Sequence, residues 1–382
     1  MVPSEDAAPV LDVDQILADP GVRIVVCCGA GGVGKTTTAA ALALRAAERH
    51  GRRTVVLTID PARRLAQSLG LTELDNTPRR VKGIDVEAGG GELHAMMLDM
   101  KRTFDDVVLQ HTDPAKAAEI FANPFYQAMS STFAGTQEYM AMEKLGQLHA
   151  RGEWDLIVVD TPPSRSALDF LDAPARLSRF LDGRMLRLLL GPARSGGRSM
   201  FSFVTASFGM FSRIVQKVLG AQLLTDLSGF VAALDSMFGG FRQRAEQTYR
   251  ILQAGETAFL LVATPEPDAV REAAYFAERL GAERMPLAGL VLNRVHRPAV
   301  ALGAAESRAA ADRLAGLGGH DATVDVLRAH AALAQQAVRE EQVAQRFTEA
   351  FPAVPTVSVT AQPADVHDVD GLRTIAAAIS RS

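Results

Sequence analysis

The sequence predicts an α/β fold, in which a mostly parallel β-sheet carries helices on both faces. Short runs of apolar and β-branched residues recur along the chain, and helical patterns separate most of them. The expected strands are 22–28, 53–60, 93–99, 156–160, 258–263, 287–293 and 353–359. The clearest helical patterns are 39–49, 269–280 and 324–347. Because strands that alternate with helices pair in parallel, both faces of such a sheet are covered.

The first predicted strand, 22–28, leads directly into a glycine-rich loop with the Walker A pattern. The loop comprises Gly29, Ala30, Gly31, Gly32, Val33, Gly34, Lys35, Thr36 and Thr37. Glycines let backbone N–H groups wrap a phosphate closely, since Cβ atoms would block that approach. Lys35 then reaches the β- and γ-phosphate oxygens, and the Thr36 hydroxyl ligates Mg²⁺. The loop therefore predicts a P-loop NTPase sheet with ATP and Mg²⁺ as cofactors.

Two further strands end in an aspartate at the edge of the sheet where ligands bind. Strand 156–160 ends in Asp160, the Walker B form, and its carboxylate is expected to hold Mg²⁺. Strand 53–60 ends in Asp60, which Pro61 and Ala62 follow. Two interpretations of Asp60 stay open on this pattern alone. It caps the next helix, where Pro is common at the first position, or it faces the nucleotide.

Two stretches, about 101–153 and 164–255, are too long for simple crossovers between strands. We expect both to be helical insertions, because structureless loops of that length are uncommon in compact domains. The predicted organisation is an N-terminal leader at 1–20 and a P-loop ATPase domain at 21–382 that carries this helical insertion subdomain.

The second insertion contains two apolar stripes at helical spacing. One comprises Phe208, Phe211, Val215 and Val218, and the other comprises Leu223, Leu227, Phe230, Leu234, Met237 and Phe241. The stripes pack against each other as core, or they line a groove for a hydrophobic client.

The composition of the chain limits which partners and which cellular compartment are expected. The chain of 382 residues is 48% hydrophobic and 22% charged, with a formal net charge of −4. Without a dense block of Lys and Arg, this charge predicts no nucleic-acid partner. The uncharged apolar stretch 199–212 is too short to span a bilayer. An acidic segment 1–20 without a signal pattern, and adjacent Cys27 and Cys28, predict a cytoplasmic protein, with a peripheral position at a membrane left open.

The order and spacing of these motifs resemble the ArsA-type ATPases over about 22–372. That family includes the bacterial arsenite-pump ATPase and the guided-entry ATPase that delivers tail-anchored membrane proteins. The resemblance rests on the glycine loop, on Asp60-Pro61-Ala62 and on the segment from Asp160 to Ser164. It implies that Asp60 is the catalytic switch I residue, which polarises the attacking water, and that Asp160 opens switch II.

The resemblance also implies three nucleotide contacts in the second half of the chain. Glu266 corresponds to a family glutamate that contacts nucleotide, and Asn293 to the asparagine that reads the adenine edge. The segment 362–365, with Pro363, lies where the loop beside the adenine is expected. From the residues alone, Glu266 is an ordinary loop acid and Asn293 a turn former.

Three departures from the family pattern concern the partners. Ala30 stands where the family usually carries a lysine that reaches the phosphates of a second subunit. The cysteines that hold zinc between guided-entry subunits are missing, and so are those that bind arsenite in the pump ATPase. We therefore expect no arsenite activation, and a homodimer or a heterodimer with a paralogous ATPase that is held without zinc.

The function that these features favour is an ATP-hydrolysing molecular switch, which couples nucleotide state to a hydrophobic client or a membrane-associated partner. One alternative is the cytoplasmic energising subunit of a membrane transporter. Another is a P-loop small-molecule kinase, in which Ser164, Arg165 and Ser166 face the substrate. A DNA- or membrane-positioning ATPase is the least favoured, because the segment 370–382 has only two arginines.

Overall fold

The computed structural model describes residues 9–60, 64–85, 90–123, 126–127, 136–162 and 243–380. They fall into two compact units. The described residues of Met1–Leu98, Leu148–Leu168 and Arg250–Ser382 form the sheet unit, and those of Asp99–Gln147 and Asp169–Tyr249 form the second unit. The apolar stripes at 208–218 and 223–241 lie outside the described residues.

The sheet unit is built on one sheet that has eight strands in the described part of the chain. Its order is β3-β4-β2-β5-β1-β6-β7-β8, and every neighbouring pair is parallel except β3 with β4. The strands are β1 (Ile24–Cys28), β2 (Arg53–Thr58), β3 (Arg79–Arg80), β4 (Glu92–Met97), β5 (Leu156–Asp160), β6 (Thr257–Ala263), β7 (Leu287–Val295) and β8 (Thr356–Thr360). The predicted α/β class with a mostly parallel sheet is confirmed.

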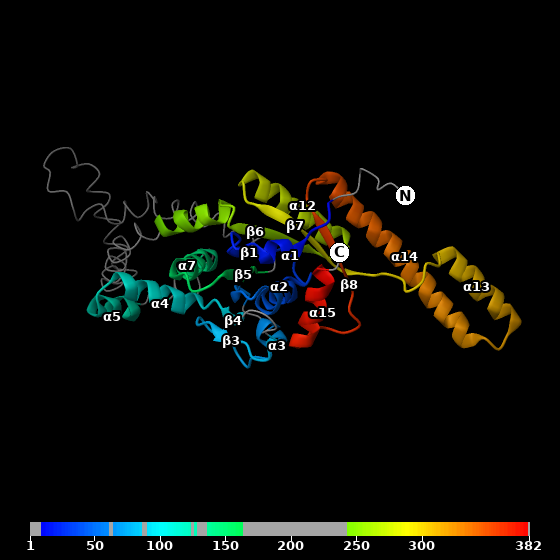
Figure 1. Ribbon diagram of the computed structural model, residues 1–382, viewed down its shortest axis with the longest axis horizontal. Helices are drawn as coiled ribbons and strands as arrows, with labels where there is room; N and C mark the ends of the chain where they lie inside the picture. Colours follow the sequence, from blue (N-terminus) through cyan, green and yellow to red (C-terminus); the bar gives the residue numbers. More distant parts are fainter. Residues whose placement is uncertain are drawn as a thin grey trace, which may run out of the picture. The chain divides into compact units, whose positions relative to one another are not determined.

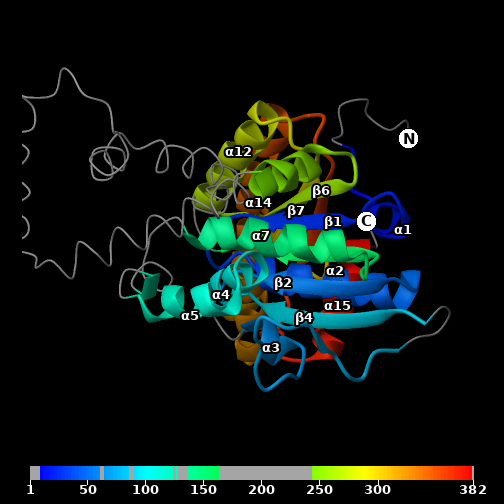
Figure 2. The same ribbon diagram turned by 90° about the vertical axis from the view of Figure 1, so that its left-hand side faces the viewer.

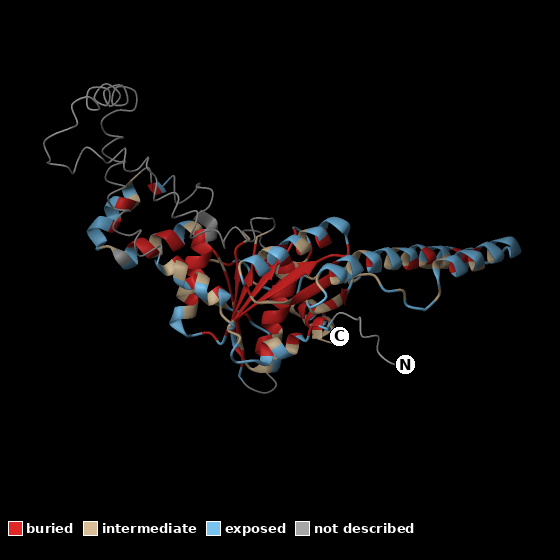
Figure 3. Cartoon of the chain, turned by 90° about the horizontal axis from the view of Figure 1, so that it is seen from above, coloured by how far each residue is buried: buried red, intermediate tan, exposed pale blue. Residues whose placement is uncertain are grey.

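Helices cover both faces of this sheet (Figure 1). Along β1, the side chains of Val25 and Cys27 enter the core formed with α2 (Lys35–His50) and α15 (Val369–Ser380). Alternate strand residues point to opposite faces, so Ile24 and Val26 face the other layer, to which α12 (Pro267–Ala282) belongs. Figure 2 shows the strands side by side, and Figure 3 shows that they are buried along most of their length. This two-sided burial explains why the strands are continuous apolar runs.

The strand register aligns the carboxyl ends of β1, β2 and β5, which carry the predicted site residues. Asp160 of β5 lies opposite Cys27 of β1 on one side and opposite Thr58 of β2 on the other. The carboxyl ends of β1, β2 and β5 therefore meet at one point of the sheet edge. In α/β proteins this edge is where ligands bind.

A helical hairpin extends from the β7 side of the sheet unit (Figure 1). It consists of α13 (Ala304–Leu317) and α14 (Asp321–Ala350), which pack along each other. The sequence predicted helix only over 324–347, and the α13 half was missed because its apolar residues are mostly alanines. Leu317, Val326 and Val338 are exposed on the hairpin.

The second unit is helical in its described part. It contains α4 (Met100–His111), α5 (Pro114–Ala122) and most of α7 (Thr136–Arg151). Asp99 and Asp113 cap α4 and α5 by accepting hydrogen bonds from backbone N–H groups in the first turn. Among the described helices, none combines the length and the apolar character that crossing a membrane requires.

Residues 9–20, the described part of the segment predicted as an N-terminal leader, belong to the sheet unit. In residues 9–20, helix α1 (Val13–Ala18) buries Val13 and Leu17 in the core against α2. Val10 forms a parallel bridge with Thr356 beside β8. The segment has too few apolar residues to show a periodic pattern, so its contacts with α2 and with Thr356 could not be predicted from the sequence.

The guanidinium of Arg52 holds the same segment to the sheet. It donates to the main-chain carbonyls of Leu17 and Asp19 at 3.2 and 3.1 Å, and to that of Val22 at 2.6 Å. A further hydrogen bond reaches the carbonyl of Asp155, just before β5. Arg52 is only 7% exposed, so these carbonyls satisfy a buried cation.

An ion-pair cluster fastens α1 to α2. The Asp14 carboxylate accepts two hydrogen bonds of 2.6 Å from the Arg45 guanidinium and lies 2.9 Å from Nε2 of His50. The hydrogen bond from Arg45, more than any other contact, lowers the pKa of Asp14 from 3.8 to about 2. Because the folded-state pKa lies below the unfolded one, this stabilisation is present above pH 3.8 and is lost as the pH falls through about 2.

We expect Asp14→Asn to lower the free energy of unfolding at pH 7 by about 1 kcal/mol, a value reduced for partial exposure to solvent. The difference from the wild type should shrink as the pH falls below 4 and vanish near pH 2. Urea unfolding at a series of pH values measures it. Asp325→Asn, at an exposed position of α14, is the control and should show no such trend. A deficit that is constant with pH would contradict the assignment.

Candidate nucleotide-binding site

The glycine loop between β1 and α2 adopts backbone conformations that other residues rarely accept. Gly34, immediately before α2, has φ of 97°, and a Cβ built there would lie 2.3 Å from Nδ2 of Asn293. At Gly29, a Cβ would lie 2.0 Å from the carbonyl oxygen of Val262 in β6. Glycine is therefore required at both positions for conformation and for space. The N-terminus of α2 is left facing the loop, as in anion-binding sites.

Lys35 lies inside this loop rather than on the surface. Its Nζ donates a hydrogen bond of 2.7 Å to the carbonyl oxygen of Ala30, and the residue is 6% exposed. Burial lowers the pKa of Lys35 below its ordinary value, and the nearby Asp160 carboxylate opposes that shift. The loop thus holds a desolvated cation against one of its own carbonyl oxygens.

Asp160 is the buried anion of the site. Its Oδ2 accepts hydrogen bonds from the hydroxyls of Thr36, at 2.8 Å, and Thr58, at 2.9 Å. Its Oδ1 is buried and has no hydrogen-bond partner among the described residues. Burial raises the pKa of Asp160 to about 6, and the hydrogen bonds from Thr36 and Thr58 oppose the rise. A buried carboxylate oxygen without a hydrogen-bond partner is costly unless it binds a cation, so Oδ1 is a candidate cation ligand.

A pocket of about 730 Å³ opens over the loop. Lys35, Thr36 and Thr37 line one part of it together with Gly32 and Gly34. Asp60, at the end of β2, lines the pocket beside them, together with Arg64 of the short helix α3 (Arg64–Ser68). The position of Asp60 at the pocket is compatible with the second interpretation, in which it faces the nucleotide.

Asn293, near the end of β7, lies directly against the glycine loop. Its Nδ2 donates a hydrogen bond of 2.9 Å to the carbonyl oxygen of Val33, and Asn293 also lines the pocket. The residues around it come from the ends of β7 and β8, from the loop before α15 and from α15 itself. They are Arg294, His296, Thr360, Ala361, Gln362, Ala364, Asp365, Val366, His367 and Ile375.

The remaining residues predicted for the site lie at its margin or outside it. Pro363 is exposed, and its neighbours Gln362 and Ala364 line the pocket in its place. Glu266 is exposed at the start of α12 and is not part of the pocket lining. None of Gly29, Ala30, Gly31 and Val33 is part of the pocket lining; Gly31 is exposed and the other three are buried. Asp160 is not part of the lining either, but it accepts a hydrogen bond from Thr36, which is.

Sequence reasoning missed Thr58 and His296. Thr58 lies two residues before Asp60 on the same strand, and its hydroxyl is one of the two donors to Asp160. His296 lies three residues after Asn293. Polar residues at the carboxyl end of a parallel strand could have signalled both positions.

The residues present fit a nucleoside triphosphate with Mg²⁺. The described residues contain no group of three or more His, Cys, Asp or Glu side chains that could hold a metal ion by themselves. Mg²⁺ is usually bound through one or two protein groups plus phosphate oxygens and waters. The Thr36 hydroxyl and the Asp160 carboxylate supply such groups, and the glycine loop supplies a phosphate cradle.

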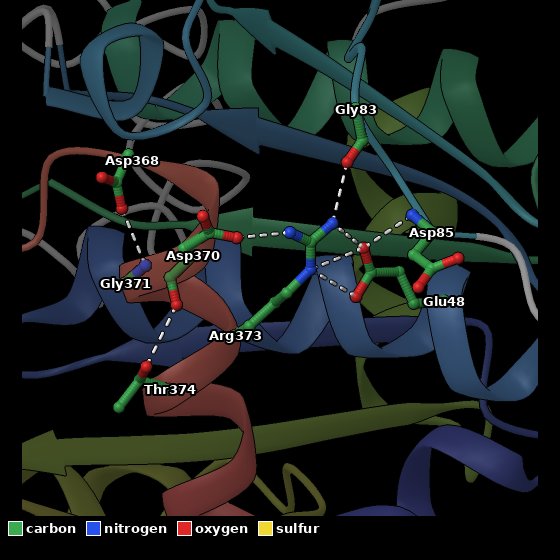
Figure 4. Close-up of polar contacts among 8 residues, drawn as sticks. All are labelled: Glu48, Gly83, Asp85, Asp368, Asp370, Gly371, Arg373 and Thr374. Atoms are coloured by element: carbon green, nitrogen blue, oxygen red, sulfur yellow. Dashed lines mark hydrogen bonds and ion pairs between the residues drawn. The ribbon is translucent and has the colours of Figure 1, made fainter.

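A second polar network fixes the loop that lines the outer part of the pocket (Figure 4). Arg373, in the second turn of α15, donates hydrogen bonds of 2.7 to 3.2 Å to the carboxylate of Glu48 on α2, and one of 2.8 Å to the carbonyl oxygen of Gly83. Asp85 N–H donates to the same carboxylate at 2.9 Å. The segment 362–367 is therefore held between β8 at one end and this clamp at the other.

We expect Arg373→Ala to raise the KM for nucleotide about threefold with little change in kcat, because lost binding alone moves KM. Since the half-buried arginine leaves a buried Glu48 behind, the free energy of unfolding should also fall by about 2 kcal/mol. Steady-state kinetics and urea unfolding measure the two effects. Arg271→Ala removes an exposed arginine of α12 and is the control. An unchanged KM would show that the clamp does not support the pocket.

Residues 22–301 match the ArsA ATPase family, described as anion-transporting ATPase. Protein Rv2184c of Mycobacterium tuberculosis is 33% identical over 171 residues, which is 42% of this chain and 39% of that protein. ATPase GET3 of Malassezia globosa is 28% identical over 177 residues, 46% of this chain and 50% of that protein.

A longer match is ATPase GET3B of Arabidopsis thaliana, 26% identical over 309 residues, 75% of this chain and 67% of that protein. The chain thus matches half or less of the first two relatives, and the family match covers most of the sheet unit. The glycine loop, Asp60 and Asp160 all lie within the matched residues. This chain belongs to the ArsA family of anion-transporting ATPases.

Proposed function

We propose that this protein binds ATP with Mg²⁺ in the pocket over the glycine loop and hydrolyses it, as a switch whose nucleotide state controls a hydrophobic client or a membrane-associated partner. The observation that carries the proposal is the Asp160 carboxylate. Two hydroxyls fix one of its oxygens, and the other is buried with no hydrogen-bond partner among the described residues.

Each side chain has a definite task in this proposal. Loop N–H groups and Lys35 bind the β- and γ-phosphates, and Thr36 and Asp160 hold the metal ion. When bound, Mg²⁺ neutralises phosphate charge that develops during the transfer. Asp60 lines the pocket one strand from Asp160 and orients the attacking water. Asn293 and the residues around it bind the nucleoside.

The partner is a proposal that rests on the family resemblance. Ala30 supplies no cation to a second subunit, so a heterodimer with a paralogous ATPase that carries the loop lysine remains part of the proposal beside a homodimer. The client would bind the apolar stripes of the second insertion. Size measurement of the isolated protein with and without nucleotide tests the homodimer, and pull-down from native extract tests the heterodimer. A protein that stays monomeric and captures no paralogous ATPase would exclude both.

The test of hydrolysis uses Asp60→Asn. We expect kcat to fall by about 10²–10⁴-fold, the range typical for loss of an acid–base group, with Kd for ATP changed less than about threefold. Asp325→Asn is the matched control. Chelation of Mg²⁺ should abolish turnover of the wild type. Full activity of Asp60→Asn would contradict the role of Asp60.

The same assay separates hydrolysis from a kinase reaction. For an ATPase, phosphate released equals ATP consumed with no added acceptor. ATP consumption that depends on a metabolite and releases no phosphate would replace the switch by the small-molecule kinase.

A further inference from the structure

His296 belongs to a polar cluster that joins the pocket to the α13–α14 hairpin. The Glu340 carboxylate of α14 contacts His296 twice: Oε2 accepts from the backbone N–H at 2.8 Å, and Oε1 lies 2.7 Å from Nδ1. Gln336, one turn earlier on α14, donates to the same Oε1 at 2.9 Å. Glu340 is 8% exposed, so a buried carboxylate fixes both the backbone and the ring of His296.

These contacts select one tautomer of the neutral ring. A nitrogen 2.7 Å from a carboxylate oxygen must carry a proton, since two acceptors at that distance would repel each other. The Gln336 amide lies farther from Nδ1, at 3.1 Å, and already donates to Glu340. Nδ1 of His296 is therefore the protonated nitrogen, and Nε2 on the opposite edge of the ring is left as a hydrogen-bond acceptor.

The position of His296 in the sheet indicates which part of the nucleotide it contacts. The phosphate cradle follows β1, whereas His296 follows β7, which lies two strands away in the sheet. Two strand spacings are about 10 Å. That separation, together with Asn293 and Gln362 beside His296 in the pocket, places the ring at the nucleoside rather than at the phosphates.

We propose that His296 is a nucleoside-binding residue whose Nε2 accepts a hydrogen bond from a donor group of the nucleoside, and that Glu340 is its positioning residue. The inference rests on the proposed nucleotide site and deepens it. The hairpin begins at Ala304, beyond the residues that match the family. Part of the nucleoside site is thus supplied by an element outside the family match.

The test measures Kd for ADP with Mg²⁺ by calorimetry, because ADP avoids turnover. We expect His296→Phe to weaken binding about tenfold, the effect of one lost hydrogen bond of about 1.4 kcal/mol. His330→Phe is the matched control. It removes another histidine that holds the hairpin, through the carbonyl of Leu302, and does not line the pocket. Binding by His296→Phe within twofold of the wild type, or equal losses in both variants, would overturn the proposal.

Three ADP analogues identify the donor. Purine riboside diphosphate lacks the base amine, 2′-deoxy-ADP lacks the 2′-hydroxyl, and 3′-deoxy-ADP lacks the 3′-hydroxyl. We expect the wild type to bind one of them about tenfold more weakly than ADP, and His296→Phe to show no such penalty for that analogue. If the penalties in the variant equal those in the wild type for all three analogues, Nε2 contacts none of the donor groups and the proposal fails.

A spectroscopic measurement tests the positioning role of Glu340. In ¹⁵N-histidine NMR spectra at pH 8.5, the wild type should show His296 protonated at Nδ1. Glu340→Gln offers the ring an amide donor or a weaker acceptor, so we expect a shift toward the Nε2–H tautomer and loss of the analogue discrimination. A tautomer unchanged from the wild type, with discrimination intact, would make Glu340 merely structural and refute its assignment.

Failure of this inference is distinguishable from failure of the proposed function. If the wild type binds ADP and Lys35→Ala does not, the nucleotide site stands, and the His296 variants alone decide the inference. If the wild type binds no ADP, both proposals fall.

Discussion

Replacing Lys35 with alanine is expected to lower kcat/KM for ATP hydrolysis by about a thousandfold, the upper range for removing one electrostatic contact to the transition state. The lysine sits under the glycine loop, with its Nζ 2.7 Å from the Ala30 carbonyl. In the proposed function, it is the cation that meets the γ-phosphate. Because Ala30 adds no charge of its own, the loss should be more complete than in a site with two lysines.

Removing the charge of Lys35 should not destabilise the protein without nucleotide. Burial lowers the pKa of Lys35 in the folded state. A lysine with a depressed folded-state pKa opposes folding, and this penalty is complete below the folded-state pKa and fades as the pH rises from there toward the ordinary value of 10.5. We therefore expect Lys35→Met, which keeps the apolar stem, to have a Tm equal to or above that of the wild type at pH 7.

Phosphate-release assays and thermal unfolding measure the two effects of the Lys35 variants. Lys101→Ala is the matched control, since Lys101 is exposed and its ammonium pairs with Asp105 in the second unit. It should leave kcat/KM unchanged. Hydrolysis by Lys35→Ala within tenfold of the wild type would contradict the role of the loop.

Arg52→Ala is expected to lower the free energy of unfolding by about 4 kcal/mol, because four main-chain carbonyls lose a charged donor and several of them stay buried. These carbonyls belong to the N-terminal segment and to the residue before β5. Arg52→Lys should restore little, since an ammonium on a flexible stem cannot reproduce the guanidinium fork.

Arg53→Ala is the matched control at the next position. The Arg53 side chain is 50% exposed, pairs with Glu92 at 3.5 Å and lies over the Trp154 ring. We expect its loss to reduce the free energy of unfolding by less than about 1 kcal/mol. Urea unfolding of the two variants provides the comparison. Equal losses in the two variants would mean that the hydrogen bonds of Arg52 to the carbonyls do not stabilise the fold more than an exposed arginine does.

Local sequence pattern was sufficient to predict the sheet and the residues at the glycine loop. All seven predicted strands correspond to strands of the sheet, because buried parallel strands are continuous apolar runs between helices. Lys35, Thr36 and Asp60 line the pocket, and Asp160 reaches it through Thr36. Each lies next to a strand end, so its position follows from local sequence once the sheet is parallel.

The sequence by itself determined the family motifs, the parallel sheet and the chemistry of the glycine loop. Only the tertiary structure decided which partners these residues have. Thr58 meets Asp160 across 102 positions of sequence, and His296 meets Glu340 across 44. Tertiary structure also left Glu266 outside the pocket lining and buried the N-terminal helix. Such contacts depend on strand register and on helix packing, which no local periodicity encodes.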